Sequence, residues 1–87
     1  INETIRKSIK YKSWRKAIFQ RDNFTCVWCG EEGGWSKELH KTIILNADHI
    51  KPFSLYPELR FTMDNGRTLC IECHQKTDTY AGRTNYV

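Results

Sequence analysis

Four cysteines, arranged as two pairs, are the side chains of this 87-residue sequence whose spacing predicts chemistry most directly. Cys26 and Cys29 form one C-x2-C unit, and Cys70 and Cys73 form a second. Together they supply four thiolates, which is the ligand set of a closed, tetrahedral structural zinc site. We therefore predict that the four cysteines bind one zinc ion, which would join the two ends of the segment 30–69.

The second pair also has two competing interpretations. The sequence CIECH at residues 70–74 contains the C-x-x-C-H signature of covalent haem attachment, and C-x-x-C also occurs in redox dithiols. Haem attachment would leave Cys26 and Cys29 without a role, and a redox dithiol needs a βαβ context that the sequence does not indicate. A zinc site uses all four cysteines, so we favour it.

Between the two pairs lies NADHIKP, residues 46–52, in which an acid and a histidine are adjacent. On a strand, Asp48 and His49 would point to opposite faces. Metal-assisted phosphodiester hydrolysis needs a carboxylate that holds a divalent ion and a separate imidazole that takes a proton from water. His74 directly follows Cys73 and would project from a zinc-anchored helix toward Asp48. Taken singly, each histidine is equally explained as a structural or surface residue; taken together, they predict a hydrolytic site.

Periodicity and turn residues predict the elements that position these side chains. Trp14, Ala17, Ile18 and Arg21 would share one face of a helix. The expected elements, in chain order, are a helix at 13–22 with Ser13 as its N-cap, a strand within 40–50, a turn at 64–66, a strand at 67–69 and a helix at 71–82 that ends at Gly82. His40 would be an exposed residue at a strand edge. The fold class is small α+β.

The charge distribution points to a polyanionic partner. The net charge is +4, and basic side chains crowd the beginning of the chain, at Arg6, Lys7, Lys10, Lys12, Arg15, Lys16 and Arg21. A solvated helix face would explain the same run equally well. The sequence has no apolar run long enough for a signal peptide or a membrane span, so we expect a cytoplasmic protein without membrane contact. In such a reducing compartment, four cysteines are more often metal ligands than two disulfides.

Four segments in this order resemble the HNH endonucleases of the ββα-metal type, in their zinc-bearing four-cysteine subgroup. They are FTCVWCG at 24–30, ADHI at 47–50, DNGRTLC at 64–70 and CIECH at 70–74. The resemblance covers roughly residues 14–82. It implies two strands and a helix around one catalytic Mg²⁺, Mn²⁺ or similar ion, and cleavage of DNA to 5′-phosphate and 3′-hydroxyl ends. By motif, His49 is the general base, Asp48 and His74 are the ion ligands, and Asn65 pins the loop that orients His49.

The resemblance also gives the predicted organisation and partners. It implies a ββα-metal HNH fold with a structural zinc site and an N-terminal helix, divided into a basic extension (1–12) and a nuclease domain (13–87). YAGR at 80–83 is similar to the tail of phage-encoded members, for which a terminase large subunit is a common partner. The substrate is expected to be double-stranded DNA, and the sequence does not assign the residues that contact it. The alternative is a non-catalytic zinc module that binds nucleic acid or a protein partner.

Overall fold

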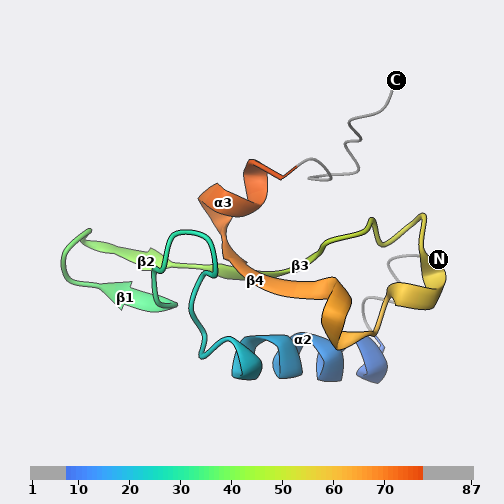
Figure 1. Cartoon of the computed structure of the whole chain (residues 1–87). Helices are drawn as coiled ribbons and strands as arrows, with labels where there is room; N and C mark the ends of the chain where they lie inside the picture. Colours follow the sequence, from blue (N-terminus) through green and yellow to red (C-terminus); the bar gives the residue numbers. More distant parts are fainter. Residues whose placement is uncertain (1–7, 78–87) are drawn as a thin grey trace.

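The computed structural model describes residues 8–77, which form two small antiparallel sheets and two helices (Figure 1). The elements are α2 (Ile9–Arg21), β1 (Gly34–Ser36), β2 (Lys41–Ile43), β3 (Leu45–His49), the 3-10 turns η1 (Pro57–Leu59) and η2 (Met63–Asn65), β4 (Gly66–Cys70) and α3 (Ile71–Gln75). β1 pairs with β2, and β3 pairs with β4. Within residues 8–77 no helix is long and apolar enough to span a bilayer. The small α+β class is confirmed.

The first helix starts earlier than the sequence indicates. Ser8 is its N-cap, and the Ser8 hydroxyl accepts a hydrogen bond of 3.2 Å from the backbone N–H of Tyr11. The predicted cap at Ser13 is wrong because that residue lies inside the helix, where its side chain is exposed. Of the four residues predicted to share one face, Trp14 and Ile18 are buried, Ala17 is half-buried and Arg21 is exposed.

The β3–β4 hairpin is the centre of the molecule, with α2 against one face and α3 on the other (Figure 1). Its register places Asp48 opposite Arg67 and His49 opposite Gly66. A side chain at position 66 would collide with α2, since a Cβ there would lie 2.5 Å from atoms of Trp14. Glycine therefore lets α2 pack directly on the hairpin beside His49.

The predicted strand within 40–50 is two strands with different partners. β2 pairs with β1, and after Ile44 the chain continues as β3, which pairs with β4. Ile43 is buried in the core and Leu45 packs against the same core, so the alternation of side chains continues across the change of partner. His40 is exposed but lies in the turn before β2 with φ 53°, so its predicted place on a strand edge is wrong.

The last helix is shorter than predicted. α3 ends at Gln75; the backbone N–H of Lys76 donates to the Cys73 carbonyl at 3.0 Å, and the backbone N–H of Thr77 donates to the His74 carbonyl at 3.1 Å. The buried Thr77 hydroxyl donates to the His74 carbonyl at 2.8 Å, and side-chain bonds of this kind compete with continued helix formation. The helix therefore does not extend through 71–82, and Gly82, its predicted end, lies outside the described residues.

The end of α2 is attached to β4 by polar contacts. The Asp22 carboxylate accepts a hydrogen bond from the backbone N–H of Thr68 at 3.0 Å, and Arg21 donates to the Gly66 carbonyl at 2.8 Å. The hydrogen bond from the Arg21 guanidinium holds the pKa of Asp22 below its ordinary value. These contacts fix the position of α2, and with it Trp14, relative to the hairpin.

Candidate zinc and catalytic sites

The four cysteines converge as the sequence predicts. The sulfur atoms of Cys26, Cys29, Cys70 and Cys73 all lie within 4.8 Å of one another. Sulfurs bound tetrahedrally about 2.3 Å from a zinc ion are about 3.8 Å apart, and the sulfurs of Cys29 and Cys70 are 3.7 Å apart. The donor set and its spacing therefore fit a structural zinc ion.

The pKa values of these thiols favour a bound cation. Burial raises the pKa of Cys26, but backbone N–H groups of Cys29, Cys70 and Trp28 counteract it and bring the pKa down to about 6. Burial and the neighbouring thiols raise the pKa of Cys73 to about 12. Without a cation, the negative charge of one thiolate opposes ionisation of the neighbouring thiols. A bound zinc ion would stabilise all four cysteines as thiolates.

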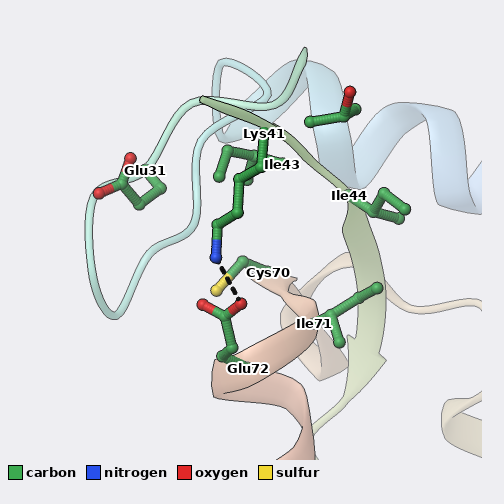
Figure 2. A pocket seen from close by; sticks show the side chains of 8 residues that line it. Glu31, Lys41, Ile43, Ile44, Cys70, Ile71 and Glu72 are labelled. Atoms are coloured by element: carbon green, nitrogen blue, oxygen red, sulfur yellow. Dashed lines mark hydrogen bonds and ion pairs between the residues drawn. The ribbon is translucent and has the colours of Figure 1, made fainter. Parts of the chain in front are cut away.

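The cysteine cluster is also part of the hydrophobic core. The buried core consists of Cys26, Ile43, Leu69, Cys70 and Cys73, with Leu45 packed against it. A shallow pocket of about 90 Å³ lies beside Cys70, and the Lys41–Glu72 ion pair of 3.0 Å crosses it (Figure 2). Neither Asp48 nor His74 lines this pocket, so it is separate from the predicted catalytic site.

The structure brings together the two predicted ligands of the catalytic ion. Asp48 is 3% exposed, and its Oδ1 lies 3.1 Å from Nδ1 of His74. Two ligands at right angles about 2.1 Å from a magnesium ion are about 3.0 Å apart, so this spacing fits a hard divalent ion. The other carboxylate oxygen of Asp48 accepts a hydrogen bond of 2.7 Å from Nε of Arg67.

His49 lies on the opposite face of β3 from Asp48, against α2. Its imidazole stacks on Trp14 with centroids 4.2 Å apart and meets the edge of Phe53 at 5.2 Å. Nε2 lies 2.9 Å from the carbonyl oxygen of Arg60. That carbonyl can only accept, so it selects the tautomer with the proton on Nε2 and the basic lone pair on Nδ1. In this tautomer Nδ1 is the ring nitrogen that can accept a proton.

Asn65 joins the loop after His49 to the start of β4. It is 6% exposed, and its Oδ1 accepts a hydrogen bond of 2.8 Å from the backbone N–H of Lys51. Its Nδ2 donates to the carbonyls of Lys51 and Leu59 at 3.3 and 3.2 Å. Asn65 also ends the 3-10 turn η2, so the turn role and the contacts to the loop coexist.

We predict that Asn65→Ala loosens this loop. The change removes the side-chain partner of the Lys51 N–H and of the Lys51 carbonyl, whereas the Leu59 carbonyl still accepts from Thr62, and the loss costs about 1–3 kcal/mol of folding free energy. Urea denaturation measures the loss. Asp64→Asn is the matched control, because Asp64 is exposed in the same turn. Equal denaturation midpoints for the two variants would show that the Asn65 contacts do not stabilise the loop.

With the geometry described, comparison with known proteins gives the family. A model of the HNH endonuclease family matches residues 26–79, a range that includes all four cysteines, Asp48, His49, Asn65 and His74. The chain belongs to the HNH endonuclease family. It is also 32% identical over 79 residues to a protein of Lactococcus phage SK1 described as "Probable HNH endonuclease", a match that covers 85% of this chain and 80% of the relative. No solved structure gives a significant match.

Two contacts in this HNH chain could not be predicted from the sequence. Trp14 was predicted as a core residue, and it is one, but it also forms a face of the pocket that holds the His49 ring. Arg67 pairs with Asp48, whereas the sequence offers Arg67 only as one of three candidate phosphate contacts, with Lys51 and Arg83, and gives no sign of the pairing. The register supplies the missing signal: pairing His49 with Gly66 places Asp48 opposite Arg67 on one face.

Proposed function

We propose that this HNH protein is a divalent-metal-dependent endonuclease that hydrolyses phosphodiester bonds of double-stranded DNA. The main support is the distance of 3.1 Å between Oδ1 of Asp48 and Nδ1 of His74. Asp48 directly precedes His49 in the chain. Consecutive α-carbons of a trans peptide are about 3.8 Å apart, so the backbone keeps the predicted base one residue from the predicted ion site, with the two side chains on opposite faces of β3.

The proposed roles follow from these positions. A divalent ion such as Mg²⁺ or Mn²⁺, bound by Asp48 and His74, would supply charge neutralisation at the leaving oxygen. His49 accepts a proton from the attacking water while the water oxygen forms its bond to phosphorus. The bond from phosphorus to the 3′-oxygen breaks, and that oxygen takes a proton from solvent. The products are a 5′-phosphate and a 3′-hydroxyl.

The surface of α2 supports a polyanionic substrate. Lys10, Lys12, Arg15 and Lys16 are all exposed on this helix, which packs directly against the hairpin that carries His49. Lysines and arginines of this kind neutralise phosphates and release counterions, which gives sequence-independent affinity for DNA. We propose that this face of α2 contacts the backbone of the duplex outside the cleaved bond.

The remaining assignments are also proposals. The division into an extension at 1–12 and a nuclease domain at 13–87 stays a prediction, although the helix of the domain starts at Ile9. YAGR at 80–83, on which association with a terminase large subunit was predicted, lies outside the described residues. We place the activity in the cytoplasm of a bacterium or a phage-infected cell; similarity to a phage protein supports this.

Plasmid cleavage tests the proposal. We expect supercoiled DNA to be cut with added Mg²⁺ or Mn²⁺, and cleavage to stop with EDTA and return when the divalent ion is restored in excess. Zinc content measured in each sample separates loss of the catalytic ion from loss of the structural one. A zinc-loaded, folded protein that binds the plasmid without cutting it under any divalent ion would favour the non-catalytic zinc module.

A further inference from the structure

Arg67 lies between the proposed ion site and the zinc-bound turn. Its Nε donates to Oδ2 of Asp48 at 2.7 Å, and its guanidinium carbon lies 4.6 Å from the centroid of Trp28. Trp28 stands between Cys26 and Cys29 in the first C-x2-C unit. One carboxylate oxygen of Asp48 thus lies next to His74, and the other lies next to Arg67. A guanidinium and the proposed ion site therefore share one carboxylate.

The contacts of Arg67 leave donors for a ligand. A guanidinium has five N–H groups in one plane, and only the Nε–H is used for Asp48. Within residues 8–77 no acceptor contacts the two Nη groups of Arg67. The ring of Trp28 covers one face of the guanidinium and fixes its plane, and the side chain remains 23% exposed. The two Nη groups, next to the proposed divalent-ion site, are donors of the kind that match the oxygens of a phosphate.

Other cations near the site are held differently. The Lys51 ammonium lies 5.1 Å from the ring of Tyr56, and the Arg60 guanidinium stacks on Phe53 and donates to its carbonyl. Both belong to the loop that follows His49. Among the described residues, Arg67 is the basic side chain other than His74 that contacts Asp48.

We propose that Arg67 binds a non-bridging oxygen of the phosphate that is cleaved, and that Trp28 of the zinc-bound turn is its positioning residue. The proposal rests on the proposed function, because it assigns the substrate contact of that same site. It differs from a purely structural role, in which Arg67 only neutralises the buried Asp48 carboxylate. A structural role would affect binding of the divalent ion, whereas the proposed role affects binding of the phosphate.

The first test uses a substrate with a single phosphate, so that contacts to neighbouring phosphates do not contribute. With bis(p-nitrophenyl) phosphate and Mn²⁺, we expect Arg67→Gln to lower kcat/KM by about 10²- to 10³-fold, the effect of losing one donor to a developing anion. Arg67→Lys keeps the charge without the planar fork and should recover part of the loss. Lys37→Gln is the matched control, because Lys37 is also a cation but lies exposed in the turn between β1 and β2. It should leave this reaction unchanged.

Ligand binding separates the two roles of Arg67 without turnover. Titration calorimetry of Mn²⁺ into each zinc-loaded variant should show no loss of affinity in Arg67→Gln, because removal of a nearby positive charge favours a cation. Titration of dTMP in the presence of Mn²⁺ should show at least a tenfold loss. An unchanged dTMP affinity, or a loss of Mn²⁺ affinity that accounts for the slower reaction, would overturn the proposal. A parent protein that binds dTMP through Arg67 but never cleaves a diester would overturn only the proposed function.

Trp28 provides a second, independent variant. It is 48% exposed, so its replacement leaves the core intact. We expect Trp28→Ala to lower kcat/KM on the diester by about 3- to 30-fold, the range that a cation–π contact supports, and Trp28→Phe to restore most of it. Trp35→Ala on β1 is the control, because Trp35 is 64% exposed and has no cationic partner in the described part of the chain. Equal rates for Trp28→Ala and Trp35→Ala, at equal zinc content, would remove Trp28 from the site.

Discussion

His49→Ala is expected to leave supercoiled plasmid uncut while DNA binding is preserved. General-base catalysis contributes about 10²- to 10⁴-fold to a rate, so the loss should bring cleavage close to the detection limit of a plasmid assay. DNA affinity should be retained, because the exposed lysines and arginines of α2 are unchanged. Binding is measured by electrophoretic mobility shift in EDTA, and cleavage in parallel with Mg²⁺ or Mn²⁺.

The structure gives the physical reason for assigning this loss to proton transfer. The carbonyl of Arg60 places the proton of His49 on Nε2, and stacking on Trp14 fixes the plane of the ring. Alanine removes the basic nitrogen and leaves a cavity against aromatic rings, so thermal melting must accompany the assay. His40→Asn is the matched control: His40 is an exposed histidine at φ 53°, a conformation that asparagine tolerates. Cleavage by a folded His49→Ala protein at the parent rate would disprove the assignment of the base.

Cys26→Ser is expected to unfold the protein. Structural zinc in small domains supplies binding free energy on the order of 10 kcal/mol, which is comparable to the whole stability of a typical domain. Cys26 is 1% exposed, and the buried core of this half of the molecule includes three of the four predicted zinc ligands. Loss of the ion would leave that core with thiols whose ionisation is opposed by their neighbours.

Circular dichroism and zinc analysis of the purified variant measure this effect. We expect little secondary structure, substoichiometric zinc and no thermal transition. Lys41→Ala provides the control because it removes the exposed ion pair with Glu72 beside the cluster but no sulfur ligand, and such pairs contribute about 0–1 kcal/mol. A Cys26→Ser protein that melts like the parent without zinc would show that the cysteines are not a structural metal site.

Much of the fold was predictable because its strongest signals are local. Two C-x2-C units specify their own ligand set, and Asp64–Gly66 indicates the turn before β4, so the core of the hairpin and the zinc cluster follow from short segments. Helix ends were predicted less well. Ser8 and Ser13 are both acceptable caps, and which one acts depends on whether Tyr11 packs near His49 and Phe53, a tertiary contact.

Among the contacts within the site, too, those set by nearby residues were predictable, and those set by tertiary packing were not. The approach of Asp48 to His74 was predicted from motif order, because His74 directly follows Cys73 of the four-cysteine cluster at the start of α3. The pairing of Asp48 with Arg67 was not, because it depends on the register of two strands that are separated by a long loop. The same holds for Trp14, whose contact with His49 requires the missing side chain of Gly66 on the facing strand.

The direct passage from β4 into α3 limits how this protein can change in length. β4 ends at Cys70 and α3 begins at Ile71, so Arg67, two sulfur ligands and His74 follow one another without a linker. Insertion of one residue within β4 would turn every later side chain of the strand to the other face, and would displace ligands of both centres at once. The turn between β1 and β2, which projects away from α2 and α3 (Figure 1), has no such constraint. We therefore expect deletions and insertions to be tolerated at residues 37–40 but not at residues 66–74.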